Sequence, residues 1–356
     1  MRTRPCGSLI SGTLPEGCRL CEQGAKMVLF VTGLCGYHCA YCPVSEEKMY
    51  RDVVFANERR VWRDEDVLDE ARAMRAGGAG ITGGDPLEVA DRVARYIRLL
   101  KAEFGPSFQT HLYTMTTDLE KIRTVAEGGL DEIRFHPPPG LWRRLETSGY
   151  PAAVAESRRL GMAVGFEVPL VPDRREDLEA LLDWAEAARL DFVNLNELEF
   201  SEANFGRLGA QGYRMKDELA YGVVGSDAAA VTLLAKPRAV TVHYCTSGYK
   251  DGWQLRSRFK RAAGTVAKAY DIVTEDGTLV KGVIEAPDLA AAENVLRGKF
   301  HVPAELVAAV PGRRRVEVAP WVLEEISSEL VWPSFIVEEY PTADALEVER
   351  RRLPAS

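Results

Sequence analysis

Cys35-Gly36-Tyr37-His38-Cys39-Ala40-Tyr41-Cys42 places three cysteines within eight residues, directly after the apolar run MVLFVT at 27–32. A short apolar run of this kind is typical of a buried parallel strand. Three thiolates in so short a loop can bind three corners of one cubane iron–sulfur cluster. A zinc site or a complete [4Fe–4S] site normally takes four protein ligands. The stretch therefore predicts a cluster with one open iron at the end of a first β-strand.

Around this loop, the first two-thirds of the chain alternates between predicted strands and amphipathic helices. One helix begins at Asp64, and another is predicted at about 87–103. Alternation of strands and helices indicates an α/β fold with a parallel sheet, either flat or curled into a barrel. The predicted strands are 27–32, 79–82, 108–114, 132–136, 162–168, 191–198 and 239–245.

The pattern changes near Gly264. Runs at 267–273 and 278–284 flank Glu275-Asp276-Gly277 and predict a β-hairpin with a tight turn. Helical stretches at 287–298 and 320–329 and extended stretches at 335–339 and 346–350 follow. We therefore predict a cysteine-bearing extension at 1–26, a barrel at 27–264 and a small α+β domain at 265–356.

The bulk composition of the 356 residues fits a globular protein. The formal net charge is −8, and 46% of residues are hydrophobic. No apolar run reaches the roughly 18 residues that a membrane span needs, and no secretory signal layout is present. We therefore expect no membrane partner and a cytoplasmic address. In that reducing compartment, the seven cysteines are better interpreted as metal ligands or redox groups than as disulfides.

A second motif, Thr82-Gly83-Gly84-Asp85-Pro86, follows the second predicted strand. Alone it indicates only a strand-to-helix turn. Together with the three-cysteine loop that precedes it, this motif is the reason that the sequence resembles the radical S-adenosylmethionine (SAM) superfamily. The signature of that superfamily is CxxxCxΦC with an aromatic residue before the last cysteine, here Tyr41.

The resemblance implies a [4Fe–4S] cluster on Cys35, Cys39 and Cys42 whose open iron is chelated by SAM. It implies that the reduced cluster cleaves SAM to a 5′-deoxyadenosyl radical, which abstracts hydrogen from a substrate. The implied cofactor contacts are Tyr41, Thr82, Gly83, Gly84 and Asp85, although the family usually has Glu where this chain has the shorter Asp85.

The same resemblance implies a partial (βα)6 TIM-like barrel and an electron donor such as ferredoxin or flavodoxin. The layout is most similar to archaeal radical SAM proteins described as related to the pyruvate formate-lyase activating enzyme. Two enzymatic hypotheses follow: direct modification of an RNA base, a peptide or protein, or a small molecule, and activation of a glycyl-radical enzyme. Surplus cysteines favour direct modification.

Four cysteines remain, namely Cys6, Cys18, Cys21 and Cys245. Four is the ligand count of a closed metal centre, and Cys18-Arg19-Leu20-Cys21 has the CxxC spacing of a half-site. We predict a second [4Fe–4S] cluster here. Structural zinc is the alternative, and a lone Cys245 could instead quench a substrate radical or carry a methyl group.

Polar residues near the ends of the later strands are candidates for contacts with substrate or SAM, because chemistry in parallel barrels lies at the C-terminal strand ends. His136, Glu167 and Asn196 are the catalytic candidates, since the family places polar residues of these strands against SAM. Further polar residues share these strands: His111, Tyr113, Thr114, Arg134 and Asn194.

The stretch 250–261, KDGWQLRSRFKR, interleaves five basic residues with Trp253 and Phe259. Such a stretch can bind a phosphate-rich partner such as tRNA, or form an ordinary solvated helix face. It supports a hypothesis from another class, an RNA-binding protein without radical chemistry. Zinc, with His38 as a fourth ligand, or a cluster would stabilise that protein.

Overall fold

The computed structural model describes residues 1–216 and 221–354. The chain forms two compact units, Met1–Arg72 with Ala76–Leu255, and Ala73–Arg75 with Arg256–Ser356. The second unit begins at Arg256 rather than at the predicted residue 265, because helix α10 (Arg256–Val266) belongs to it. Within the described ranges, no helix is both long and apolar enough to cross a membrane.

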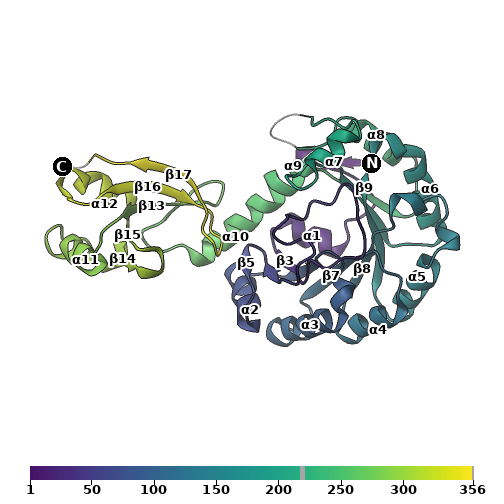
Figure 1. Ribbon diagram of the computed structural model, residues 1–356, viewed down its shortest axis with the longest axis horizontal. Helices are drawn as coiled ribbons and strands as arrows, with labels where there is room; N and C mark the ends of the chain where they lie inside the picture. The colour runs from purple at the N-terminus through teal and green to yellow at the C-terminus, as the bar shows by residue number, and fades with distance from the viewer. Residues whose placement is uncertain (217–220, 355–356) are drawn as a thin grey trace. The chain divides into compact units, whose positions relative to one another are not determined.

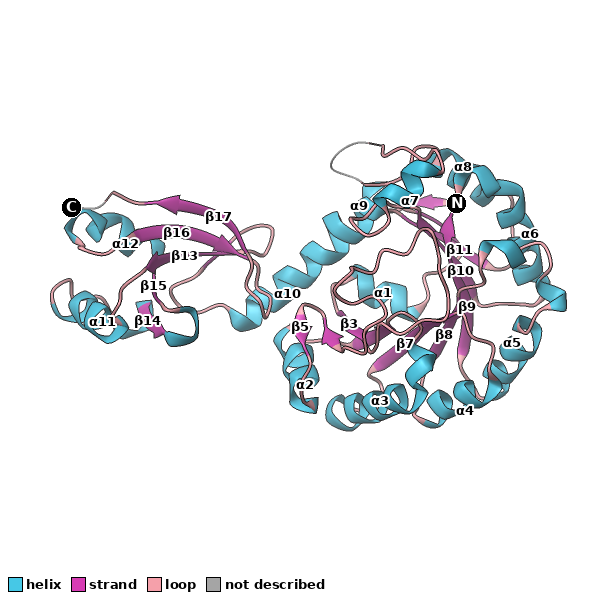
Figure 2. Ribbon diagram, in the orientation of Figure 1, coloured by secondary structure: helices cyan, strands magenta, loops and turns pink. Residues whose placement is uncertain are grey.

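The first unit is a curved sheet whose seven central strands run parallel (Figure 2). Each predicted strand is present, and the parallel run has seven strands where the resemblance implied six. In sheet order these strands are β3 (Lys26–Phe30), β6 (Gly78–Thr82), β7 (Gln109–Thr114), β8 (Glu132–Phe135), β9 (Ala163–Leu170), β10 (Phe192–Glu197) and β11 (Thr241–Cys245).

Short antiparallel strands extend the sheet at both ends. β2 (Leu9–Ser11) pairs with β11 and with β1 (Arg2–Thr3). At the other end, β4 (Phe55–Ala56) pairs with β3 and with β5 (Arg59–Arg60). The path does not close on itself within the described residues. The expected α/β partial barrel is thus confirmed.

Helices surround this sheet on its outer side (Figure 1). In α3, buried Val93, Ala94, Ile97 and Leu100 recur at helical spacing, and Gly105, at φ 92°, ends the helix. The helices that follow the strands are α2 (Asp64–Ala73), α3 (Ala90–Phe104), α4 (Leu119–Glu127), α5 (Tyr150–Arg159), α6 (Arg175–Ala187), α7 (Phe205–Ala210), α8 (Ser226–Ala235) and α9 (Ser247–Tyr249), which continues into a π-helix at Lys250–Leu255.

The predicted extension at 1–26 is an integral part of the first unit. Its helix α1 (Glu16–Glu22) lies inside the ring of strands (Figure 1). A Cβ at Gly17 would overlap His111 Nδ1 and come within 2.6 Å of Arg134 Nη2. A glycine is therefore required where α1 approaches the inward face of β7 and β8.

The second unit is an antiparallel sheet in the order β14-β15-β13-β16-β17, with β12 also on β13. Its strands are β12 (Ile272–Val273), β13 (Leu279–Ile284), β14 (Val307–Val310), β15 (Arg315–Val318), β16 (Ser334–Glu339) and β17 (Glu347–Arg352). Helices α11 (Leu289–Gly298) and α12 (Pro320–Ile326) pack on its apolar core. The sequence analysis missed β14 and β15. β15 alternates buried Val316 and Val318 with Arg315 and Glu317, which are buried as an ion pair.

Candidate functional site

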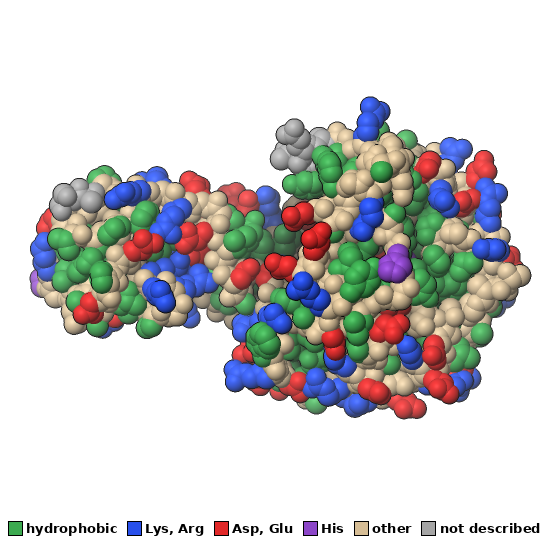
Figure 3. All heavy atoms as spheres, viewed as in Figure 1, with side chains coloured by type: hydrophobic (Ala, Val, Ile, Leu, Met, Phe, Trp, Pro, Cys, Tyr) green, Lys and Arg blue, Asp and Glu red, His purple; other side chains and the backbone are tan. Residues whose placement is uncertain are grey.

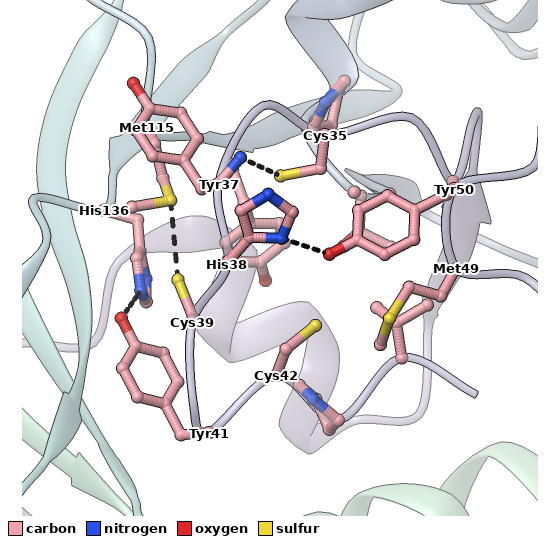
Figure 4. Close-up of a pocket in the computed structure, with 18 of the residues that line it drawn as sticks. Cys35, Tyr37, His38, Cys39, Tyr41, Cys42, Met49, Tyr50, Met115 and His136 are labelled. Atoms are coloured by element: carbon pink, nitrogen blue, oxygen red, sulfur yellow. Dashed lines mark hydrogen bonds between the residues drawn. The ribbon is translucent and has the colours of Figure 1, made fainter. Parts of the chain in front are cut away.

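The three-cysteine loop leaves β3 and lines a cavity of about 330 Å³ at the C-terminal ends of the parallel strands. Cys35, Cys39 and Cys42 contribute three sulfur atoms directed toward a common space (Figure 4). Thr82, Gly83 and Gly84, at the end of the neighbouring strand, form part of the same wall. The fold thus brings together the two sequence motifs.

Local hydrogen bonds hold the loop in shape. Gly33 N donates to Arg51 O at 2.7 Å, and Tyr50 N returns a bond to Gly33 O at 2.9 Å. Cys42 N donates to Cys39 O at 3.1 Å, and Cys35 Sγ accepts from Tyr37 N at 3.4 Å. The loop is therefore preorganised by its own backbone.

The donor set fits a cubane. All three cysteines are free thiols, and burial raises the pKa values of Cys35 and Cys39. Metal binding would displace their protons. In residues 1–216 and 221–354, no three His, Cys, Asp or Glu side chains converge as ligands of a single ion. A cubane does not require this, because each thiolate binds a different iron.

His38, the fourth ligand in the zinc alternative, has a different partner. Its Nδ1 lies 2.6 Å from the hydroxyl oxygen of Tyr50. Figure 4 shows the two side chains facing each other beside the cysteines.

The Gly-Gly turn is hydrogen-bonded to the residues that lead into the cysteine loop. Gly84 N donates to Thr32 O, and Asp85 N donates to Leu34 O, both at 2.8 Å. A Cβ at Gly84 would overlap Leu34 O and lie 2.7 Å from Gly33 O and 2.8 Å from Cys35 Cβ. Only glycine allows this approach of the two backbones.

We expect Gly84→Ala to lose cluster binding, because the new methyl group must push the Cys35 end of the loop away. The measurement is iron per chain after anaerobic reconstitution. Gly140→Ala is the matched control, since a Cβ there meets nothing within 4 Å. Equal iron contents in the two variants would contradict this role for Gly84.

The Asp85 side chain, for which the resemblance implied a contact with SAM, is not among the residues that line the cavity. Its buried carboxylate accepts from Thr114 Oγ1 at 2.7 Å, Met115 N at 3.0 Å and Leu87 N at 3.1 Å. Burial raises its pKa, although these three donors oppose that effect. Asp85 therefore fastens the Gly-Gly turn to the end of β7.

Tyr41 and His136 face each other in the wall of the cavity (Figure 4). His136 Nδ1 donates to Glu167 O at 2.6 Å, so its Nε2 accepts from the Tyr41 hydroxyl at 2.9 Å. Burial lowers the pKa of His136 and keeps the ring neutral. The pair joins the cysteine loop to the ends of β8 and β9.

Glu167 is the centre of a buried polar network. Its carboxylate accepts from Arg134 Nη1 at 2.7 Å, Asn196 Nδ2 at 2.8 Å and Asn194 Nδ2 at 3.0 Å. The catalytic candidates His136, Glu167 and Asn196 all line a second cavity of about 290 Å³. This cavity shares Tyr41, Thr82 and His136 with the cysteine cavity.

The remaining strand candidates have structural partners. His111 is buried on β7, and its Nε2 lies 2.8 Å from the Tyr113 hydroxyl oxygen. Thr114 holds Asp85. Tyr113 and Thr114 also line the cysteine cavity.

The other four cysteines come from α1, the N-terminal turn and the end of β11. Cys18 accepts from Asn194 Nδ2 at 3.1 Å. Cys18 and Cys245 are buried and Cys21 is half-buried. Desolvation raises the pKa of all three thiols, and Cys18 raises the pKa values of Cys21 and Cys245 further. Cys6 Sγ is 3.6 Å from the Cβ position of Gly252, and Cys245 Sγ is 4.0 Å from Gln254 Nε2 in the same π-helix.

The basic stretch 250–261 is divided between the two units. Lys250 lines the second cavity and pairs with Glu199 at 2.8 Å. Arg256 pairs with Asp276 at 2.8 Å, and Arg261 Nε donates to Met74 O at 3.2 Å. These three basic side chains therefore have acidic or backbone partners within their own units.

Two residues that line the cavities are not among the site residues predicted from the sequence. Lys250 belongs to the basic stretch, which indicates a different role, and Arg207 lies in an insertion without periodicity. Both side chains reach the cavities, Arg207 from α7 and Lys250 from the π-helix after β11. Only the folded chain places them there.

Comparison with known proteins agrees with this geometry. The family model described as "Radical SAM superfamily" matches residues 29–137, and one described as "Domain of unknown function (DUF8061)" matches 277–353. A Methanocaldococcus jannaschii protein named "Putative glycyl-radical enzyme activating enzyme" is 35% identical over 95% of this chain and 92% of its own length.

Two solved structures are similar to part of this chain. Methylornithine synthase is 16% identical, with a TM-score of 0.41 over 60% of this chain and 63% of that one. Streptococcus suis SuiB bound to its precursor peptide is 12% identical, with a TM-score of 0.37 over 55% and 48% of the two chains.

Proposed function

The chain belongs to the radical SAM superfamily, and from this premise we propose that it is an enzyme that reductively cleaves SAM. The observation that carries the proposal is the meeting of three free thiols with the Gly-Gly turn in one cavity. When bound, the cluster supplies the electron that cleaves SAM to a 5′-deoxyadenosyl radical, which abstracts hydrogen from the substrate.

The chain's own residues would hold the cofactors as follows. Cys35, Cys39 and Cys42 bind the cluster, and the backbone of 82–84 offers polar groups to SAM. The Tyr41–His136 pair and the carboxamide of Asn196 line the joined cavities, where they can orient the rest of SAM. Glu167 acts through Asn196, whose amide it fixes at 2.8 Å.

The test is anaerobic reconstitution followed by incubation with SAM and dithionite. We expect 5′-deoxyadenosine and methionine to form in equal amounts. Reconstituted protein that holds iron and sulfide but forms neither product would overturn the proposal.

We further propose that Cys6, Cys18, Cys21 and Cys245 hold a second [4Fe–4S] cluster. Cys18 and Cys21 lie one turn apart on α1, which contacts the π-helix, and Cys6 and Cys245 also lie beside that π-helix. Buried Asn194 Oδ1 and His243 Nδ1, on paired residues of β10 and β11, have no hydrogen-bond partner among the described residues. Buried polar atoms of this kind are rare and fit a missing group.

The double variant Cys18→Ala/Cys21→Ala should lose about four irons per chain, because it removes two of four ligands to that cluster. It should keep cleaving SAM, since the loop at 35–42 is unchanged. Iron and sulfide counting with EPR of the reduced protein measures this. An unchanged iron count, or zinc in place of iron, would contradict the second cluster.

We propose a protein or peptide substrate. The name of the M. jannaschii relative supports activation of a glycyl-radical enzyme as the specific candidate. Half-exposed Tyr37 and Tyr50 line the cavity, and the face of the first unit seen in Figure 3 shows hydrophobic side chains interspersed with charged ones. Exposed aromatic residues are enriched at protein interfaces. The division of the basic stretch gives tRNA less support.

A low-potential donor such as ferredoxin or flavodoxin would supply the electron. The free cysteines fit the reducing cytoplasm, where we propose that the enzyme works. Incubation with SAM and candidate glycyl-radical proteins, followed by EPR for a protein-based radical, distinguishes activation from direct modification.

A further inference from the structure

Two side chains of the insertion after β10 hold the backbone of the cysteine loop. Arg207 Nε donates to Ala40 O at 3.1 Å, and Arg207 Nη2 donates to Cys42 O at 3.4 Å. Asn204 Nδ2 donates to Tyr41 O, between them, at 3.1 Å. Three consecutive carbonyl groups, from Ala40 to the last cysteine, are therefore bound from outside the loop.

The insertion is itself anchored. Asn204 is fully buried, and its Oδ1 accepts from Ser201 N at 2.8 Å. Leu208, one residue after Arg207, is buried in a cluster with Leu198, Phe200 and Val223, and Tyr41 packs against this cluster. Helix α7, which carries Arg207, is thus anchored by buried side chains on both sides of that residue.

Arg207 also lines the cysteine cavity. Its permanent positive charge lies beside the loop that ends at Cys42. Charge and hydrogen bonding near a cluster set its reduction potential, and a nearby cation favours the reduced, more negative state.

We propose that Arg207 is a positioning residue that fixes the Cys39–Cys42 part of the loop and makes the cluster there easier to reduce. This inference rests on the proposed function, because it takes the cluster of Cys35, Cys39 and Cys42 as given. The planar guanidinium suits the role, since it can bind two carbonyl groups at once.

The experiment is a reductive titration of the anaerobically reconstituted full chain, followed by EPR. We expect Arg207→Met to lower the ratio of reduced to oxidised cluster about tenfold at a fixed potential, a shift of about 59 mV for one electron. Arg207→Lys should restore most of the potential, because it keeps the charge. It should still lose iron faster to a chelator, because it cannot bind both carbonyl groups.

Arg98→Met is the matched control, since Arg98 is exposed on α3. If Arg207→Met has the same midpoint potential as this control and the wild type, the inference is overturned. A wild-type protein that binds no cluster and cleaves no SAM would instead overturn the proposed function. The Cys18→Ala/Cys21→Ala background isolates the signal of the cluster concerned.

Discussion

Replacing Cys35, Cys39 and Cys42 together with alanine is expected to abolish SAM cleavage. Among the described residues, no other thiols line the cavity that contains the Gly-Gly turn. The variant should therefore form no 5′-deoxyadenosine above background, measured by chromatography after incubation with SAM and dithionite. It should also lose about four irons per chain and keep about four on the remaining cysteines.

The Cys18→Ala/Cys21→Ala variant is the control, because it removes buried thiols outside that cavity. It should lose a similar amount of iron but keep the activity. Near wild-type cleavage by the triple variant would exclude the loop as the cluster site. If the triple variant lost all of its iron, the proposal of the first cluster would stand. The second cluster would be excluded, because no iron would remain on Cys6, Cys18, Cys21 and Cys245.

Replacing Glu167 with alanine is expected to have the largest effect on stability. It leaves Arg134, only 2% exposed as a side chain, with one carboxylate partner, Glu132, instead of two. Removing one partner of a buried ion pair costs about 3–5 kcal/mol in the free energy of unfolding. Since Glu132 remains, we expect the lower end, about 3 kcal/mol. Urea unfolding followed by tryptophan fluorescence measures it.

The loss should depend on pH in a defined direction. Burial raises the pKa of Glu167, but Arg134, Asn196 and Asn194 outweigh it, so the pKa lies below its ordinary value. The ionised carboxylate therefore contributes stability above the unfolded pKa of about 4.3, and loses it as the pH falls through the folded value. The difference between wild type and variant should be full at pH 7 and shrink on acidification below about pH 4.

Glu176→Ala is the matched control, because Glu176 forms an ion pair with Arg143 at 2.9 Å while its side chain is 81% exposed. Exposed pairs contribute little, so the control should unfold like the wild type at every pH. If Glu167→Ala unfolded at the same urea concentration as Glu176→Ala at every pH, the buried network around Glu167 would not stabilise the barrel.

Local patterns were enough to predict all seven parallel strands, because each strand alternates with a helical pattern even where it carries polar residues. They failed at β14 and β15, where Arg315 and Glu317 are buried through ion pairs with each other and with Glu339 of β16 and Lys281 of β13. They also predicted that the second unit starts at residue 265, whereas it starts at Arg256. The local sequence of α10 does not indicate with which of the two cores its apolar face packs.

The sequence by itself predicted the cofactor chemistry of this protein. The spacing of Cys35, Cys39 and Cys42 after a strand, and the Gly-Gly turn after the next, are local features that a short backbone segment fully specifies. The fold class follows in the same way, because the local patterns along the sequence predict strands that alternate with helices.

Only the tertiary structure decided which side chains serve the site. It assigned Asp85 to β7 rather than to the cavity, and it brought Arg207 and Lys250 to the cavities from distant segments. It also placed Cys6 and Cys245, which are far apart in sequence, beside the same π-helix. The physical reason is that these contacts join residues far apart in sequence, so they exist only after the sheet has curved around α1.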